Sequence, residues 1–266
     1  GNGKMHCMEK SPRTAAKNVP AAVREFMEEV FVLKVRIKFR KNGVMKFIGH
    51  LDIMRFFQKA LRRADIPVAF SGGFSPHMIM SFANPLGVGL TSDGEYFDLE
   101  LTEPISSQDA VNRLNAQMAD GMEVISFVQI PDDKKAKGMS IVAGADYYSY
   151  PKYTSLPDNW QEKLQEFYAQ KEILVWKATK KSEKEVNIKP MIYQLTSREN
   201  GIYMKVAAGS VQNLKPELVT DAFASYLGLN GCIFAHHRLE TYANQGTEEQ
   251  PIFVPLDSLG TEIISC

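Results

Sequence analysis

The amino-acid sequence predicts an α+β protein made of two ferredoxin-like (split βαβ) units in tandem, each with an antiparallel sheet. Two observations predict this fold class. The chain has 266 residues, which corresponds to about two domains at the usual domain size. Each half also shows the same order of strand, helix, strands, helix and strand, which is the order of the split βαβ motif. The two halves share this order without detectable sequence identity.

The expected organisation has five segments. They are an N-terminal arm with a short helix (1–30), a first ferredoxin-like domain (31–131), a charged linker (132–144), a second ferredoxin-like domain (145–243) and an irregular tail (244–266). The boundary between the domains is placed at the linker because its sequence is charged and aperiodic.

In the first domain, apolar Val35, Ile37 and Phe39 alternate with basic residues, which is the period of a strand with one apolar and one basic face. Asn42-Gly43 predicts a hairpin turn into a second strand over 44–48. Apolar residues at three- and four-residue steps predict a helix over 50–64. The remaining expected elements are strands at 68–70, 78–82 and 95–101, a helix capped by Ser106 and stopped near Gly121, and a strand at 122–130.

The second domain is predicted in the same way. Asp158 is expected to cap a helix that ends near Gln170, and Pro216 is expected to open another that Gly228 ends. Asn200-Gly201 predicts a hairpin turn. The expected strands are 145–150, 172–178, 191–197, 202–207 and 233–242, with a solvated loop at 180–185.

Composition excludes several classes of protein. Lys plus Arg and Asp plus Glu both total 31, so no overall charge attracts the chain to nucleic acid or membrane. We expect a cytoplasmic protein without a membrane partner, since there is no secretory signal and no apolar run of about 18 residues. Cys7, Cys232 and Cys266 are too dispersed to hold a metal or an iron–sulfur cluster. We therefore expect no metal and no cofactor bound by this chain.

Local charge is nevertheless polarised in the first domain. Residues 34–63 contain ten basic residues against Asp52 alone, and residues 88–129 contain eight acidic residues against Arg113. The functional hypothesis is a phosphate- or RNA-binding surface. Its candidate residues are the helix stripe of Arg55, Lys59 and Arg62 and the strand residues Arg36 and Lys38. The alternative is that Asp98 and Glu100 neutralise the strand residues across the sheet, leaving the helix stripe merely solvated.

A glycine-rich segment carries a second hypothesis. The pocket loop, defined as Ser71, Gly72, Gly73, Phe74, Ser75 and His77, has exposed backbone N–H groups that could cradle an anion. We expect it to share a pocket with the N-terminus of the helix that starts at His50. The alternative is a wide connection between strands that requires special backbone angles.

His50, Asp52 and His77 are the candidate catalytic residues. Two imidazoles beside a phosphodiester could act as general base and general acid near neutral pH without a metal. In the structural alternative, His50 makes a loop or capping hydrogen bond and Asp52 lies in the first helical turn, where the helix dipole favours a carboxylate.

The combination of motifs resembles a known family. Phe47-Ile48-Gly49-His50-Leu51-Asp52, the helix end 60–64, the loop 71–86, the strand 95–101 and the segment 184–190 together are similar to the radical SAM-linked protein family, a bacterial domain of unknown function. The match covers most of 33–240. The resemblance implies an accessory role beside a radical S-adenosylmethionine protein, whose own cofactors would be S-adenosylmethionine and an iron–sulfur cluster. It implies no catalytic residue.

The leading expectation is therefore a non-catalytic accessory protein of a radical SAM enzyme that presents RNA or another phosphate-bearing substrate. A metal-independent ribonuclease and a protein–protein interaction module are the two alternatives.

Overall fold

The computed structural model describes residues 32–178 and 182–265, and its central feature is one large, mostly antiparallel sheet. The path of strands through this sheet is β12-β4-β1-β3-β10-β5-β9-β8, with β2 paired to β3 and β11 paired to β10. The predicted α+β class is confirmed. The predicted N-terminal arm and its helix lie outside the described residues.

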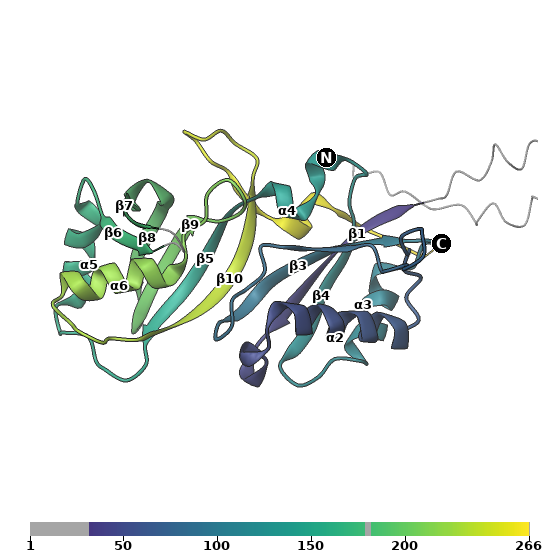
Figure 1. Cartoon of the computed structure of the whole chain (residues 1–266), viewed down its shortest axis with the longest axis horizontal. Helices are drawn as coiled ribbons and strands as arrows, with labels where there is room; N and C mark the ends of the chain where they lie inside the picture. Colours follow the sequence, from purple (N-terminus) through teal and green to yellow (C-terminus); the bar gives the residue numbers. More distant parts are fainter. Residues whose placement is uncertain (1–31, 179–181, 266) are drawn as a thin grey trace, which may run out of the picture.

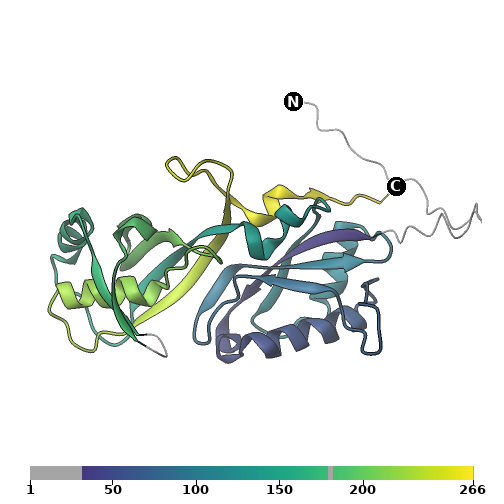
Figure 2. The same cartoon turned by 45° about the horizontal axis from the view of Figure 1, so that its top comes forward.

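The first unit contains four neighbouring strands with two helices on one face. Its elements are β1 (Leu33–Lys41), η3 (Gly43–Phe47), α2 (His50–Arg63), β2 (Met80–Ala83), β3 (Thr91–Leu101), α3 (Ser107–Asn115) and β4 (Met122–Gln129). The order across the sheet is β4-β1-β3-β2. Helices α2 and α3 lie side by side beneath this part of the sheet (Figures 1 and 2).

The second unit repeats this arrangement. Its main elements are β5 (Val142–Pro151), α5 (Trp160–Ala169), β8 (Ile192–Arg198), β9 (Gly201–Ala207), α6 (Pro216–Tyr226) and β10 (Phe234–Asn244), with sheet order β10-β5-β9-β8. A separate hairpin of β6 (Leu174–Ala178) and β7 (Glu183–Asn187), followed by η5 (Lys189–Met191), is inserted between α5 and β8. The predicted loop at 180–185 is wrong at its end, because β7 begins at Glu183, and its first two residues lie outside the described ranges.

Each unit has a core between its helices and its part of the sheet. In the first, Ile37 and Phe97 from the sheet pack with Phe57 of α2. In the second, Tyr147 and Met204 pack with Phe223 of α6. Because side chains on a strand alternate between the two faces, the neighbours of these residues point to the helix-free face.

The two units meet through a short parallel ladder between β3 and β10. Only two pairs form it, Thr91 with His237 and Ser92 with Arg238. The rest of the junction is polar and largely buried. Arg238 of β10 contacts Glu95 of β3 at 2.9 Å, and the units therefore form one continuous sheet rather than two separate sheets.

The predicted hairpin at Asn42-Gly43 is wrong. Residues after Asn42 form the 3-10 helix η3 instead of a strand. The physical reason is that β1 already pairs with β3 on one side and with β4 on the other. A strand folding back from Asn42 would have no free edge of β1 to bond.

The linker and the tail are more structured than predicted. The linker contains η4 (Lys134–Ala136) and α4 (Gly138–Ile141), and the tail contains β11 (Phe253–Pro255), η6 (Leu256–Leu259) and β12 (Thr261–Glu262). The tail returns across the first unit, on the side opposite α2 and α3 (Figure 1, yellow). There β12 pairs with β4, and Ile263 is buried in the first core.

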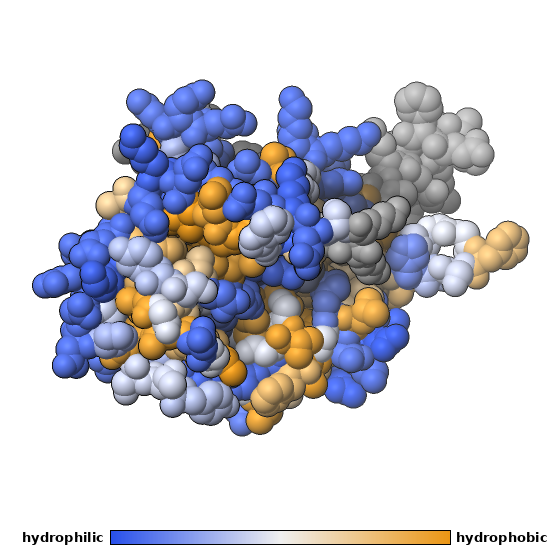
Figure 3. All heavy atoms as spheres, turned by 60° about the vertical axis from the view of Figure 1, so that its left-hand side comes forward, coloured by the Kyte–Doolittle hydropathy of each residue, from blue (hydrophilic) through white to orange (hydrophobic). Residues whose placement is uncertain are grey.

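Within the described ranges, no helix has the length and apolar character needed to cross a membrane. The end of the molecule formed by the second unit shows apolar patches surrounded by hydrophilic side chains (Figure 3).

Candidate nucleic-acid interface

Arg36 is a structural residue and not part of an open phosphate-binding surface. Its side chain is 1% exposed. The guanidinium donates two hydrogen bonds to Asp98, at 2.7 and 3.0 Å, and further bonds to the carbonyl oxygens of Ala136 and Leu256. Because these bonds use the donors of a buried group, no phosphate can reach it. The alternative hypothesis of cross-strand neutralisation holds for this pair.

Lys38 also forms an ion pair, but its partner is Glu240 and not the expected Glu100. Its Nζ lies 2.6 Å from Oε2 of Glu240 in β10, while Glu100 lies opposite Lys34. The Glu240 carboxylate also accepts a hydrogen bond from the Tyr96 hydroxyl. Lys38 thus contributes to the junction between the two units. The prediction that it binds phosphate is wrong.

The helix stripe has the exposure that the strand residues lack. Arg55, Lys59 and Arg62 all lie on the exposed side of α2, and the adjacent Arg63 is exposed too. Arg55 forms an ion pair with Asp52 at 3.1 Å, and both side chains are about two-thirds exposed. Lys59, Arg62 and Arg63 form no ion pair with the part of the chain that the structure describes. Such exposed cations remain available to a polyanion.

His50 lies at the start of α2 with its ring packed against Phe82, at 5.0 Å between ring centroids. Partial burial lowers the pKa of His50, and the nearby positive charge of Lys41 lowers it further against the opposing effect of Glu95. Asp52, in the first turn of the same helix, is exposed. Asp52 lies in the first turn of the helix, where the helix dipole favours a carboxylate, as the structural alternative predicted. His50 contacts an aromatic ring rather than a backbone group.

The pocket loop is an exposed turn closed by its own residues. Ser71 Oγ lies 2.9 Å from Nδ1 of His77 and also accepts a hydrogen bond from the backbone N–H of His77. Gly73 has φ of +97°, a conformation that favours glycine. Phe74 is fully exposed at the tip. These bonds give His77 a role in closing the loop.

The structure does not bring the loop and the helix N-terminus together. The loop follows the bridge between Val68 and Leu101, at the end of β3 opposite Leu33. His50 lies at the other end, against Phe82, and about five residues of mostly extended chain separate Phe82 from His77, roughly 16 Å. His50 and His77 therefore cannot act together on one phosphodiester, and the expected shared pocket is wrong.

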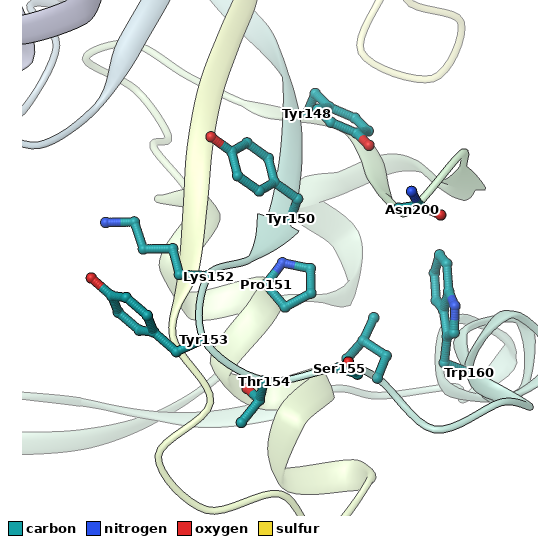
Figure 4. A pocket seen from close by; sticks show the side chains of 10 residues that line it. Tyr148, Tyr150, Pro151, Lys152, Tyr153, Thr154, Ser155, Trp160 and Asn200 are labelled. Carbon is teal, nitrogen blue, oxygen red and sulfur yellow. The ribbon is translucent and has the colours of Figure 1, made fainter.

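A feature that the sequence analysis missed lies in the second unit. An open cleft of about 770 Å³ surrounds the end of β5 and the loop that follows it (Figure 4). Ten residues line this aromatic cleft, namely Tyr148, Tyr150, Pro151, Lys152, Tyr153, Thr154, Ser155, Leu156, Trp160 and Asn200. Four of them are aromatic and one, Lys152, is charged.

Two of the three tyrosines of the aromatic cleft, Tyr148 and Tyr150, come from the alternation of β5. Tyr147 points to the helices and is buried in the core, so Tyr148 and Tyr150 point to the other face. Burial raises the pKa of the Tyr148 hydroxyl, and the charge of Glu199 raises it further. The sequence signal was present as three tyrosines within four residues of one strand, followed by Lys152. The strand was predicted, but the aromatic character of its outward face was not.

Comparison with known proteins gives one clear match. The sequence model of a family described as "Uncharacterized protein conserved in bacteria (DUF2344)" matches residues 34–216. No curated protein matches the chain. Among solved structures, a chain of the "Crystal Structure of a Cbf5-Nop10-Gar1 Complex" aligns with a TM-score of 0.42 and 13% sequence identity, covering 78% of this chain and 48% of that chain. The chain thus spans about half of that protein, and a likeness of this size carries no functional argument.

Proposed function

We propose that this chain, which belongs to the bacterial protein family DUF2344, is a non-catalytic accessory protein that presents RNA or another phosphate-bearing substrate to a radical S-adenosylmethionine enzyme. The class of partner rests on the resemblance of the motifs around His50 and the pocket loop to radical SAM-linked proteins. The partner would supply S-adenosylmethionine and the iron–sulfur cluster, and the pair would work in the cytoplasm.

The observation that carries the proposal is the helix stripe of α2. Arg55, Lys59 and Arg62 lie within about two turns of one helix, where their charges can follow successive phosphates. Of these three residues, only Arg55 has an ion-pair partner in the described parts of the chain. An exposed pair of this kind contributes little to stability, so a phosphate can replace Asp52 at small cost.

The arrangement of each unit is compatible with the predicted tandem of ferredoxin-like units. Strand orders β4-β1-β3-β2 and β10-β5-β9-β8 both follow the fourth-first-third-second order of a split βαβ unit when the β6–β7 hairpin is set aside. We assign both units to this topology as part of the proposal, because it leaves one sheet face of each unit free of its own helices.

The experiment is a salt titration of RNA binding. The triple variant Arg55→Ala, Lys59→Ala, Arg62→Ala should bind RNA more weakly than the parent, with little dependence on RNA sequence. The slope of log affinity against log salt should fall by about two to three, since each lost phosphate contact removes about 0.7–0.9. Fluorescence anisotropy with a labelled RNA at several salt concentrations measures both quantities.

A charge-matched control distinguishes the loss of a local binding site from a general effect of removing three positive charges. Lys134, Lys135 and Lys137 are also exposed, so their triple alanine variant removes the same charge from the other side of the first unit. It should keep the affinity and the slope of the parent. Equal losses in both variants, or no RNA binding by the parent, would contradict the proposal. Co-purification from native cells should in addition recover a radical SAM enzyme.

A protein–protein interaction module is the second candidate, favoured by one observation. Val44, Phe47, Leu51 and Val88 are large apolar side chains, each at least 60% exposed, around η3 and the start of α2. Exposed apolar side chains that gather in one region mark interaction sites. If Phe47→Ser abolishes recovery of the partner enzyme while RNA binding persists, this end of the first unit holds the partner. The ribonuclease alternative has no such support, because the two histidines lie far apart.

A further inference from the structure

We infer that the aromatic cleft of the second unit binds unpaired bases of single-stranded RNA. This inference deepens the proposed function and rests on it, since it names the form of RNA that the protein presents. It is carried by the neighbouring aromatic rings, the polar groups beside them and the charge of the lining. The site is distinct from the helix stripe, which contacts phosphates and not bases.

The rings form a platform on which bases can stack. Tyr148 and Tyr150 lie two residues apart on β5, with ring centroids 5.9 Å apart and ring planes inclined by 32°. Tyr150 is 44% exposed and Tyr153, in the following loop, is 80% exposed. Every base has a flat aromatic face, so exposed aromatic rings on a sheet bind single strands by stacking. Bases within a duplex are already stacked on one another and are not available for this contact.

Two further lining residues of the aromatic cleft supply shape and hydrogen-bonding groups. Trp160, at the start of α5, and Asn200, in the turn between β8 and β9, line the aromatic cleft, and the Tyr148 ring points toward Asn200 (Figure 4). The Asn200 amide offers both donors and an acceptor for base edges. Gly201 makes the approach possible, because a Cβ at this position would lie 2.7 Å from Cζ of Tyr148. A larger residue there would displace the tyrosine ring.

The charge of the lining itself is positive, and the nearest carboxylate that acts on it, Glu199, lies outside the lining, beside Tyr148. Lys152 is the one charged residue among the ten that line the aromatic cleft, and none of the ten is a carboxylate. Lys152 is exposed and forms no ion pair with residues 32–178 or 182–265. It is therefore placed to contact a phosphate next to a stacked base. Hydroxyl groups of Thr154 and Ser155 lie along the same loop. A nucleic-acid strand uses the aromatic, polar and cationic groups together, whereas an acidic peptide would use mainly Lys152.

The test uses the full chain and a labelled 12-nucleotide single-stranded RNA of mixed sequence. Tyr150→Ala should weaken binding by about tenfold, the usual scale for the loss of one stacked base. Tyr150→Trp should restore it, since tryptophan also stacks. Lys152→Ala should lower the salt slope by about 0.7, whereas Tyr150→Ala should leave the slope unchanged. An unlabelled duplex of the same sequence should compete much less well than the single strand.

Two further variants separate a loss of binding from a loss of folded protein. Tyr153→Ala changes an exposed loop residue and should also weaken binding. Tyr226→Ala is the matched control, because Tyr226 is 40% exposed on α6 and lies outside the aromatic cleft. It should bind RNA as the parent does.

The outcomes distinguish this inference from the proposed function. If the parent binds RNA but Tyr150→Ala and Tyr153→Ala bind equally well, the aromatic cleft is not the site, and the proposed function stands. If the parent binds no RNA at all, both fail. Equal competition by duplex and single strand, or displacement of the RNA from this cleft by an acidic peptide at similar concentration, would also overturn the inference.

Discussion

Two adjacent histidines in β10 show how strongly local surroundings decide the chemistry of one residue type. His236 is buried, and its Nδ1 lies 2.7 Å from the Ser149 hydroxyl. His237 points to the other face, where its ring nitrogens lie 2.7 Å from Thr91 Oγ1 and 2.8 Å from Asp93 Oδ2. Burial, with a smaller contribution from the charge of Lys152, lowers the pKa of His236 to about 4.

This pKa predicts acid sensitivity of the fold. The pKa of His236 is lowered to about 4 in the folded chain from an ordinary value of 6.5, so the unfolded chain binds more protons between these values. The free energy of unfolding should therefore fall as the pH is lowered from about 6.5 to about 4, by on the order of 3 kcal/mol in total for this group. Urea denaturation at pH 7, 6, 5 and 4.5 measures it.

The variant His236→Gln isolates that contribution. It cannot take up a proton, so its unfolding free energy should change less with pH than that of the parent over the same interval. Ser149→Ala is the companion variant, because it removes the hydroxyl that lies 2.7 Å from His236 Nδ1 and leaves the imidazole in place, so its unfolding free energy should still fall as the pH is lowered. Identical pH profiles for the parent and His236→Gln would show that His236 does not titrate abnormally.

At the scale of single elements, the cap of α3 shows what a local pattern can determine. Ser106 was predicted to begin this helix, and its Oγ accepts a hydrogen bond from the backbone N–H of Asp109 at 3.1 Å. This bond satisfies one of the free N–H groups at the helix start. A cap of this kind depends on a few neighbouring residues, which is why the sequence alone predicts it.

Ser106→Ala should lower the free energy of unfolding by about 1 kcal/mol, because the helix loses its cap. Ser106→Asp should retain most of the stability, since a carboxylate caps a helix about as well and lies at the positive end of its dipole. Chemical denaturation of the two variants beside the parent makes the comparison. Equal losses for alanine and aspartate would indicate that the hydroxyl matters for packing rather than for capping.

The elements that could not be predicted depend on distant residues. Asn42-Gly43 has the composition of a hairpin turn, but the edges of β1 are occupied by strands more than 50 residues further along the chain. The tail lacks a periodic pattern, yet Leu256 is completely buried and Asp257 bonds to both Tyr96 and Ser126. The structure of such segments is determined by contacts with residues that are distant in the sequence.

Some features of the candidate site could likewise be predicted from the sequence, and others could not. Exposure of Arg55, Lys59 and Arg62 follows from the helical period, so the sequence predicted it. Burial of Arg36 could not be predicted, because the carbonyl of Leu256, one of its acceptors, comes from the tail. The aromatic cleft was missed for a similar reason. It forms only when the end of β5 meets Trp160 and the turn at Asn200.

At the scale of the whole molecule, the junction between β3 and β10 couples the two units. The backbone ladder there has two residue pairs, so side chains provide much of the connection. Arg238 is buried and bonds to Glu95 and to the carbonyl oxygen of Asn84, both in the first unit, and to the hydroxyl of Tyr147 in the second. This arrangement predicts that the two units unfold together.

The variant Arg238→Met should uncouple the units. It leaves the buried Glu95 carboxylate without its ion-pair partner, a change that usually costs about 3–5 kcal/mol. Differential scanning calorimetry should show one transition for the parent and two for the variant. Arg198→Met, at the exposed end of β8, is the control and should keep one transition. A single transition in Arg238→Met would mean that the tail and the ladder are sufficient to couple the units.

The return of the tail to the first unit has a consequence for how the protein is made. A ribosome releases β4 long before β12, and synthesis of the chain from Gln129 to Glu262 takes roughly 7–27 s at 5–20 residues per second. During that interval the outer edge of β4 lacks its final strand, and Ile263 has not yet closed the first core. The nascent first unit therefore keeps an open strand edge until the segment that contains β12 has been translated.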